Sequence, residues 1–390
     1  MRVLIDYRSA LRSRSGVGEY TFRLVKALHD TAGDNGSGRS VELTAFSSSW
    51  KDRLRLPTEL AGVACIDRRV PVSVLNFSWH RLGFPSAEAL TGVRMDVVHS
   101  FHPLLMPSRR AAQVVTIHDL DFLAHPERTR GEIRRDYPAL ARTHAHRADR
   151  IVVVSEFTAQ EVTLLLDVPR ERISVCRPGA PEWSPRDSPP SDGYVLFFGT
   201  LEPRKNVGVL LDAFERVLAR SASGSRPGAT PRLVLAGNAT VEAAPWLERL
   251  ARPPLAGRVR HLGYVDPARR RELYEGAQML VQPSLQEGFG FPVLEAMTVG
   301  VPVVVTDRGA LPEVLGDAGL VVDAEDPLQM ADAIERMTTD EQLAAACSAR
   351  GVARAKEFRW ADTAQHALDA YQQAIEHRRR RGAGTRARTT

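Results

Sequence analysis

The residues with the clearest chemical potential lie between Glu287 and Glu295, where the sequence reads EGFGFPVLE. An acid precedes a glycine-rich turn, and a second acid follows behind a proline. The pattern predicts a helix over 293–299 with Pro292 at its first position. The N–H groups of residues 289–294 would then point out of the helix N-terminus, which suits a phosphate or a sugar hydroxyl. We expect Glu287, in the loop, and Glu295, in the first turn, to reach one ligand from the same side.

A structural explanation of the same residues is also open. An acid in the first turn of a helix is favourable beside the helix dipole by itself, and Gly-Phe-Gly can be a turn that binds nothing. The surroundings favour function, because QPSLQ precedes the motif at 282–286 and GVPVV follows it at 300–304. The whole segment resembles the E-x7-E signature of retaining glycosyltransferases of the GT4 type, which have the GT-B fold. The resemblance implies that Glu287 binds hexose hydroxyls of a nucleotide-diphospho-sugar and that Glu295 accepts hydrogen bonds from its ribose.

Two cations, Arg204 and Lys205, follow the predicted strand 194–198 and the loop GTLEP. Asn206 is expected to cap the helix that comes next. Cations and free N–H groups at such a helix N-terminus can hold a diphosphate without a metal ion. The alternative is a pair of ordinary exposed charges. The segment again resembles the GT4 motif, which implies that Arg204 and Lys205 neutralise the charge on the departing diphosphate.

The segment VVTIHDLDFLAHPE places His118 and Asp119 directly after the predicted strand 114–117. A His beside an Asp is often a structural hydrogen-bonding pair, and this alternative stays open for both residues. The segment resembles the His-Asp segment of GT4 enzymes, where such a His faces the donor sugar. We therefore expect His118 to contact the donor sugar near the reacting carbon.

Gly16 and Gly18 lie in the loop 12–18, between the predicted first strand and a helix over 19–28. They would let the backbone approach the diphosphate or the acceptor at the carboxyl end of that strand. Thr21 stands where a G-x-G-x-x-G fingerprint has its third glycine, which disfavours a dinucleotide site. A tight turn without a ligand explains this stretch equally well.

The resemblance also implies the remaining donor contacts and the reaction. Besides Gly16, Gly18 and Glu295, it assigns donor binding to Gly199, Asn238, Val265, Gly288, Phe289, Gly290, Phe291 and Leu294. It implies catalysis by His118, Arg204, Lys205 and Glu287 without a covalent nucleophile, as the departing phosphate takes the acceptor's proton in a front-face substitution. GDP-mannose is the favoured donor, because residues 78–127 resemble the mannosyltransferase-like branch, and a UDP- or ADP-hexose is the open alternative. The expected acceptor is a glycan or lipid-linked hydroxyl in cell-surface polysaccharide assembly, and no cofactor or metal ion is expected.

Two parallel sheets are needed to position these residues. Short β-rich runs alternate with helical segments, which is typical of doubly wound α/β domains. The fold class is therefore α/β, and the GT-B resemblance implies two Rossmann-like parallel-sheet domains facing across a cleft. The first half has predicted strands at 2–6, 41–46, 97–99, 114–117, 151–154 and 173–175. The second half has predicted strands at 194–198, 232–235, 259–262, 279–281, 303–305 and 320–322.

The proline- and serine-rich stretch 184–193 is the expected linker between the domains. We predict an acceptor-side domain over 1–183 and a nucleotide-sugar domain over 190–356. A helix over 357–376 would return to the N-terminal domain, and 377–390 would form a disordered Arg-rich tail. Residues 32–40 and 221–231 are expected to form a surface loop and a disordered insertion.

The chain has 390 residues, three scattered Cys and a net charge of +5. Six Arg lie within 377–390, which contain no acid, so the rest of the chain has a net charge of −1. These features indicate a reduced, cytoplasmic protein that does not bind nucleic acid, with no run of apolar residues long enough to span a membrane. The Arg-rich tail and the arginines of 128–150 could contact an anionic membrane or a lipid-diphosphate acceptor. A solvated helix face is the alternative for 128–150.

Two other classes of protein remain open. A nucleotide-sugar epimerase or a phosphorylase can share this fold, and the phosphorylase would need one of only four Lys for pyridoxal phosphate. A non-catalytic nucleic-acid-binding protein would depend on the Arg tail, which the near-neutral remainder of the chain argues against.

Overall fold

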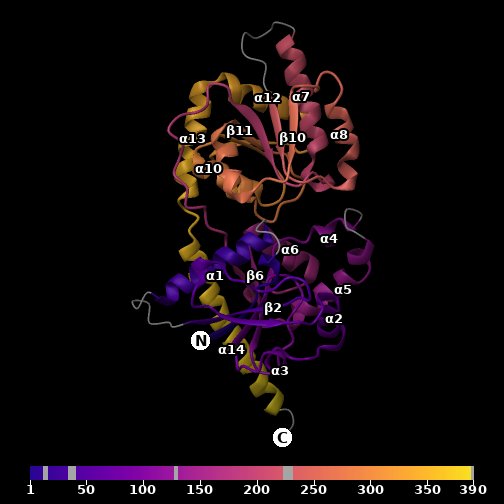
Figure 1. Cartoon of the computed structure of the whole chain (residues 1–390), viewed down its shortest axis with the longest axis vertical. Helices are drawn as coiled ribbons and strands as arrows, with labels where there is room; N and C mark the ends of the chain where they lie inside the picture. Colours follow the sequence, from indigo (N-terminus) through magenta and orange to yellow (C-terminus); the bar gives the residue numbers. More distant parts are fainter. Residues whose placement is uncertain (12–15, 34–40, 127–130, 223–231, 388–390) are drawn as a thin grey trace. The chain divides into compact units, whose positions relative to one another are not determined.

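The computed structural model of the chain describes residues 1–11, 16–33, 41–126, 131–222 and 232–387 (Figure 1). Most of the predicted loop at 32–40 and insertion at 221–231 lies outside these described residues. The chain divides into two compact units. Unit 1 consists of Met1–Gly179 with Arg359–Thr390, and unit 2 of Ala180–Phe358.

Unit 1 is built on a parallel sheet whose described strands have the order β3-β2-β1-β4-β5-β6-β7. Because all strands run the same way, their carboxyl ends share one edge of the sheet. The strand order reverses between β1 and β4, and such a switch point is where open α/β sheets bind ligands. The strands are β1 Arg2–Asp6, β2 Glu42–Ser48, β3 Ala64–Arg68, β4 Val97–Ser100, β5 Ala112–Ile117, β6 Arg150–Val153 and β7 Ile173–Val175.

Helices cover this sheet and bury its apolar side chains. The long helix α14 from the C-terminal end of the chain packs against α1 and against strands β4 to β7. Val115, Ile117 and Ile151 of the central strands are fully buried in one of the clusters between sheet and helices. The helices are α1 Val17–Gly33, α2 Val72–Phe77, α3 Ala87–Thr91, α4 Asp121–Ala124, α5 Gly131–Arg147, α6 Glu156–Leu166 and α14 Trp360–Ala387.

Unit 2 repeats the plan with a parallel sheet of described strand order β10-β9-β8-β11-β12-β13. Its switch point lies between β8 and β11. The strands are β8 Tyr194–Phe198, β9 Leu233–Ala236, β10 Val259–Gly263, β11 Ala277–Gln282, β12 Val303–Thr306 and β13 Gly319–Val322. The helices are α7 Val207–Ala222, α8 Ala244–Leu250, α9 Arg270–Glu275, α10 Phe291–Val299, α11 Leu311–Leu315, α12 Pro327–Thr339 and α13 Glu341–Ala355.

The predicted fold class, two doubly wound parallel-sheet domains, is confirmed, and every predicted strand overlaps an observed one. Strand β3 was not predicted. Its sequence ACIDR lacks a clear apolar pattern, because the strand lies at the sheet edge and is largely exposed. Unit 2 begins at Ala180, before the expected linker. Arg186, within that linker, donates through its N–H to Val299 O at 2.9 Å and through Nη1 to Ala277 O at 2.5 Å. These bonds tie the segment to unit 2.

The C-terminal end of the chain also differs from our expectation. We expected disorder from residue 377, but α14 continues through Ala387. The buried carboxylate of Asp149 lies 3.5 Å from His377 and 3.6 Å from both Arg378 and Arg381. These long-range pairs hold the end of the helix on unit 1, and composition alone could not reveal them.

Candidate functional site

Lys205 and Glu287 meet at the switch point of unit 2. Lys205 ends a short 3-10 helix, Pro203–Lys205, that follows β8, and Glu287 lies in the loop that follows β11. These strands are neighbours in the sheet, so their following loops lie side by side. The N–H of Leu285 donates to Arg204 O at 2.8 Å and joins the two loops. The strand order therefore brings together two residues that the sequence predicted separately.

The carboxylate of Glu287 is buried and surrounded by donors. Its Oε1 lies 2.5 Å from Lys205 Nζ and accepts hydrogen bonds from Ser284 Oγ at 2.9 Å and Gln282 Nε2 at 3.0 Å. Its Oε2 lies 3.8 Å from Arg204 Nη1. Only 7% of Glu287 and 8% of Lys205 is exposed. Gln282 and Ser284 precede the motif in the sequence, and their hydrogen bonds to Glu287 were not predicted.

This environment sets the charge of the pair. Burial by itself would raise the pKa of Glu287, but Lys205 and then Arg204 hold that pKa below its ordinary value. Burial also lowers the pKa of Lys205, and the nearby carboxylate opposes this shift. The Glu287 carboxyl group is consequently ionised at neutral pH.

Arg204 is the more accessible cation, since 27% of its side chain is exposed. Its Nε lies 2.6 Å from Glu202 Oε1. Asn206 is not the helix cap that we predicted. It has a left-handed backbone, with φ of 56°, and its side chain donates to Ala324 O at 2.8 Å. Asn tolerates this conformation, so the residue terminates the 3-10 helix before α7 begins.

The N-terminus of α10 presents fewer free donors than expected. The N–H groups of Val293 and Leu294 donate to Gly290 O at 3.0 and 3.3 Å. Within the described part of the chain, the N–H groups of Phe289, Gly290 and Phe291 make no hydrogen bond, so an anion could bind them. Gly290 has φ of +105°, and a Cβ there would lie 2.9 Å from a Leu311 methyl group, which explains the glycine.

The apolar residues predicted to bind donor have structural side chains. Phe289 is buried, and its ring packs against those of Phe291 and Phe358. Leu294 is fully buried, and its N–H is already used. Gly288 and Phe289 can therefore contact a donor only through the backbone, whereas the half-buried Phe291 can also use its side chain.

Glu295 lies in the second turn of α10, not in the first turn as we expected. Its Oε1 accepts a hydrogen bond from Arg270 Nη1 at 2.7 Å and its Oε2 one from Tyr274 Oη at 2.8 Å. The Arg270 guanidinium also lies over the Phe198 ring, which stacks on Tyr274. No local pattern predicts Arg270 or Tyr274 as site residues, because their contact with Glu295 depends on how α9 packs against α10.

The other predicted donor residues of unit 2 follow neighbouring strands. Gly199 follows β8 and donates its N–H to Ala236 O at 2.8 Å. Asn238 lies just beyond β9 with its side chain exposed, and its O accepts from Leu201 N at 2.7 Å. Val265 is half-buried just beyond β10. All three lie at the same edge of the sheet as Glu287.

In unit 1, the predicted residues Gly16 and His118 lie close to one residue, Tyr20. The Tyr20 N–H donates to Gly16 O at 3.0 Å, and the Tyr20 ring meets the His118 ring edge-on at 5.1 Å. Gly18 belongs to the first turn of α1 and not to the loop where we placed it. The rest of that predicted loop, 12–15, lies outside the described residues.

His118 is held as a neutral imidazole. Burial, followed by the nearby His102, lowers its pKa to about 4. Its Nε2 is buried and has no hydrogen-bond partner among the described residues. A neutral ring with a free nitrogen can donate to or accept from a sugar hydroxyl.

Sequence reasoning missed a polar cluster at the switch point of unit 1. Asp6, the last residue of β1, accepts hydrogen bonds from Arg8 Nη2 at 2.6 Å and Arg8 Nε at 2.8 Å, and its Oδ2 lies 3.3 Å from His102 Nε2. Burial opposes charge on Asp6, but Arg8 keeps its pKa well below the ordinary value. The only signal was an acid at the end of the first strand.

The described residues show neither a metal-binding cluster nor a membrane-spanning helix. No group of three or more His, Cys, Asp and Glu side chains there is arranged to hold a metal ion. No helix there combines the length and apolar character needed to cross a bilayer.

Comparisons with known proteins identify the family of the chain. Residues 14–181 match the family described as Glycosyltransferase Family 4, and residues 192–340 match Glycosyl transferases group 1. The O-antigen chain mannosyltransferase B of Escherichia coli is 33% identical over 288 residues, which cover 71% of this chain and 74% of that protein.

Solved structures show the same fold at low identity. Sucrose-phosphate synthase from Thermosynechococcus elongatus has a TM-score of 0.75 at 18% identity, covering 96% of this chain and 99% of that one. HepE of Anabaena, in complex with UDP and glucose, has a TM-score of 0.67 at 16% identity, covering 95% and 99%. The chain therefore belongs to family 4 of the glycosyltransferases and is a hexosyltransferase with the GT-B fold.

Proposed function

We propose that this enzyme transfers a hexose, with retention of configuration, from a nucleotide-diphospho-sugar to a hydroxyl of a glycan or lipid-linked acceptor. The observation that carries the proposal is the buried Lys205–Glu287 pair at the switch point of unit 2. It combines a cation for a diphosphate with an ionised carboxylate for sugar hydroxyls, beside the free N–H groups of Phe289 to Phe291.

Each charged group has a role in this reaction. Arg204 and Lys205 neutralise the charge that grows on the departing diphosphate, which lowers the barrier without a covalent intermediate. Glu287 fixes the hexose through its hydroxyls, and Glu295 takes the ribose hydroxyls while Arg270 and Tyr274 hold its carboxylate in place. The departing phosphate oxygen removes the acceptor's proton as the new bond forms on the same face of the sugar.

GDP-mannose is the donor we favour, and cell-surface polysaccharide assembly is the setting. The 33% identity to an O-antigen chain mannosyltransferase supports both. We also propose that the reaction needs no metal ion, since Arg204, Lys205 and backbone N–H groups supply the positive charge. Undiminished transfer in EDTA is the expected result, and a strict requirement for Mg²⁺ would contradict it.

Peripheral contact with the cytoplasmic face of a membrane would give the enzyme access to a lipid-linked acceptor. Unit 1 exposes large apolar side chains on and after α2, which supports such contact: Val74 is 57% exposed, Phe77 63%, Leu82 67% and Phe84 60%. We propose no role for nucleic acid as a partner.

Thermal stabilisation by GDP, UDP and ADP tests the donor site. A nucleotide at about 100 times its dissociation constant should add roughly 2.7 kcal/mol of stability. We expect GDP to stabilise the wild type and to lose this effect in Lys205→Ala, whereas the exposed Lys51→Ala serves as a control. A parallel assay with GDP-mannose and a mannan or polyprenol-linked oligosaccharide measures transfer. No response to any of the nucleotides would contradict the proposed donor site.

A further inference from the structure

A pocket of about 270 Å³ lies in unit 1 at the amino-terminal edge of its sheet. Arg2 and Ala112 begin β1 and β5, and Asp96 precedes β4, so the floor is made by the starts of parallel strands. Helix α14 contributes Ile375, Arg378 and Arg379 to the wall. Asp6 ends β1 and His118 follows β5, so both lie at the opposite edge of the sheet. The pocket is therefore separate from the candidate catalytic edge.

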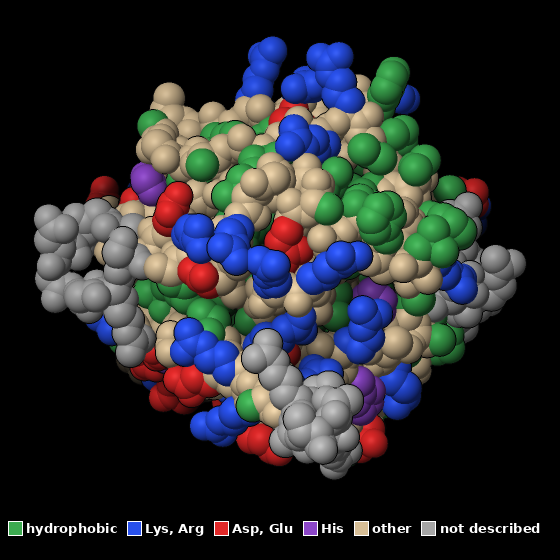
Figure 2. Space-filling model, turned by 90° about the horizontal axis from the view of Figure 1, so that it is seen from below, with side chains coloured by type: hydrophobic (Ala, Val, Ile, Leu, Met, Phe, Trp, Pro, Cys, Tyr) green, Lys and Arg blue, Asp and Glu red, His purple; other side chains and the backbone are tan. Residues whose placement is uncertain are grey.

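The pocket is strongly cationic. Arg2, Arg94, Arg110, Arg378 and Arg379 line it, against two acids, Glu88 and Asp96. Figure 2 looks onto the end of unit 1 where α14 finishes and shows Lys and Arg side chains gathered across that face.

Both acids are already engaged. Asp96 Oδ2 accepts the Arg2 N–H at 2.7 Å, and its Oδ1 lies 3.8 Å from the Arg2 guanidinium. Glu88 Oε1 accepts Ser108 Oγ at 2.6 Å and the N–H of Arg110 at 3.1 Å. Neither acid is paired with the guanidinium of another pocket arginine.

Three arginines of the pocket keep their charge available. The guanidinium groups of Arg94, Arg110 and Arg379 form no hydrogen bond or ion pair with any described residue. Like charges held together in this way are unfavourable without a counter-ion. A ligand that supplies negative charge would therefore bind them favourably.

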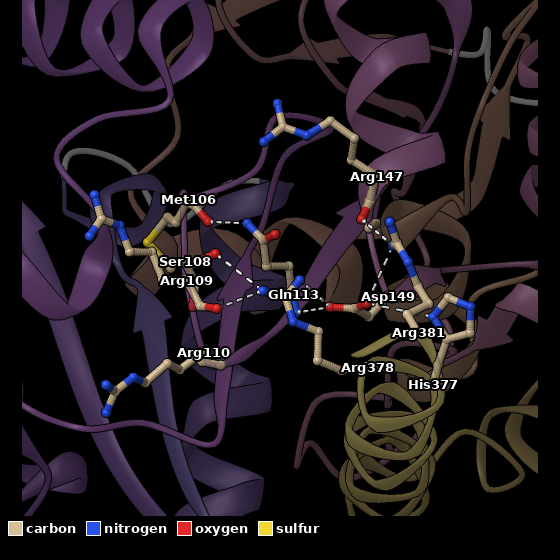
Figure 3. Close-up of polar contacts among 12 residues, drawn as sticks. Met106, Ser108, Arg109, Arg110, Gln113, Arg147, Asp149, His377, Arg378 and Arg381 are labelled. Atoms are coloured by element: carbon tan, nitrogen blue, oxygen red, sulfur yellow. Dashed lines mark hydrogen bonds and ion pairs between the residues drawn. The ribbon is translucent and has the colours of Figure 1, made fainter. Parts of the chain in front are cut away.

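The turn that carries Arg110 is held from both sides. Glu88 binds its N–H groups, and Arg378 Nη2 donates to the carbonyls of Ser108 at 3.4 Å and Arg109 at 3.0 Å. Figure 3 shows Arg378 reaching from α14 to these carbonyls, while the side chain of Arg110 extends away from the network. The backbone of Arg110 is thus held in place before any ligand binds, so binding does not have to order this turn.

The α14 end of the pocket is fixed as well. Asp149 is 1% exposed, accepts the Gln113 N–H at 2.9 Å and lies 3.6 Å from Arg378 Nη1. Arg381, one turn further along α14, lies 3.6 Å from the same carboxylate (Figure 3). These pairs anchor the helix segment that presents Arg379 to the pocket.

We propose that this arginine pocket binds a phosphate-bearing anion, with Arg94, Arg110 and Arg379 donating charge-assisted hydrogen bonds to phosphate oxygens. The guanidinium group presents parallel N–H donors that match phosphate geometry. The volume lies just below the range of about 300–1,000 Å³ typical of drug-sized ligands, so the pocket suits a phosphate or diphosphate group and not a whole nucleotide-sugar. The proposal is independent of the transfer reaction proposed above.

The test compares two triple variants of the full chain. Arg94→Ala/Arg110→Ala/Arg379→Ala removes the available cations of the pocket. Arg109→Ala/Arg147→Ala/Arg380→Ala removes the same charge from exposed arginines that do not line it. Circular dichroism and thermal unfolding establish that both variants fold. Calorimetry then measures pyrophosphate binding, and sedimentation measures binding to vesicles. Both assays use 0.15 M NaCl, which screens non-specific electrostatic attraction to the surface.

The two probes distinguish the sources of the phosphate. We expect pyrophosphate to bind the wild type and the control variant, and to bind the pocket variant at least ~10-fold more weakly. If the pocket variant, but not the control variant, also fails to bind vesicles of phosphatidylcholine with phosphatidate, the natural phosphate belongs to a lipid. If only pyrophosphate binding is lost, it belongs to a soluble anion. Absence of binding of either probe to the wild type, or equal loss in both variants, would overturn the proposal.

Discussion

Replacing Lys205 with Ala tests both the stability and the function of the buried ion pair. The wild-type Nζ lies 2.5 Å from Glu287 Oε1, and the side chains are only 10% and 9% exposed. The variant leaves a buried carboxylate with Ser284, Gln282 and the more distant Arg204. Removing one partner of a buried pair typically costs about 3–5 kcal/mol. Since the neutral donors and Arg204 remain, we expect a loss near 3 kcal/mol, at the low end of that range.

A double-mutant cycle separates the pair from its surroundings. Glu287→Gln should also destabilise the protein, because it leaves Lys205 as a buried cation without its carboxylate. Combining Lys205→Ala with Glu287→Gln removes both charges, so the double variant should be more stable than the sum of the two single losses predicts. We expect a coupling of roughly 1–3 kcal/mol from urea unfolding at pH 7. Coupling below about 0.5 kcal/mol would refute the claim that the two residues act as a pair.

The pH dependence gives a second measurement of the same pair. Because the folded-state pKa of Glu287 is below its ordinary value of 4.5, the unfolded chain takes up the proton first as the pH falls. The stabilisation from Glu287 is therefore present above pH 4.5 and is lost as the pH falls toward the folded-state pKa. Lys205→Ala should make the free energy of unfolding depend less on pH below pH 4.5. An unchanged pH dependence in this variant would contradict an electrostatic origin of the stabilisation from Glu287.

Three further predictions concern other parts of the molecule. Arg270→Ala should lower the free energy of unfolding by about 1.5–3 kcal/mol and weaken nucleotide binding, because it removes a charged hydrogen bond to the buried Glu295. Urea unfolding measures the first effect and nucleotide titration the second, with Arg271→Ala at a half-exposed position as the control. Gly309→Ala should lower the unfolding temperature, since Gly309 has φ of +63° and an added Cβ would lie 2.6 Å from the backbone N and O of Glu287. If the variant unfolds at the same temperature as the wild type, this close approach is contradicted. Burial lowers the pKa of His99 from 6.5 to about 3. Between these two pH values the unfolded chain binds a proton that the folded protein does not, so the free energy of unfolding should decrease as the pH falls from 6.5 to about 3. His99→Gln should reduce that slope by up to ~1.4 kcal/mol per pH unit, and an unchanged slope would exclude His99 as its source.

The strands could be predicted because local sequence determines them. The run YVLFF at 194–198 is apolar and bounded by Gly193 and Gly199, and β8 has these limits. The edge strand β3 has no such run, so it was missed. The continuation of α14 to Ala387 was also beyond local reasoning, because it depends on a carboxylate, Asp149, more than 200 positions earlier in the chain.

The contacts between the candidate site residues could not be predicted from the sequence. Lys205 and Glu287 are 82 positions apart, and their contact follows from the adjacency of β8 and β11, which the sequence does not state. Arg270 and Tyr274 were missed for the same reason, since they act only through Glu295 on another helix. Asn206 was misassigned because Asn suits both a helix cap and a left-handed turn, and only the backbone path selects between them.

The geometry of Glu287 limits how it can act on a sugar. A carboxylate oxygen offers two lone pairs, and Oε1 already faces three donors, on Lys205, Ser284 and Gln282. In the role that we propose for Glu287, a hexose hydroxyl would therefore bind through Oε2, on the side where Arg204 lies 3.8 Å away. Ser284 then serves to orient the carboxylate without supplying charge. It follows that Ser284→Ala should slow transfer while leaving nucleotide binding intact, whereas Lys205→Ala should impair both.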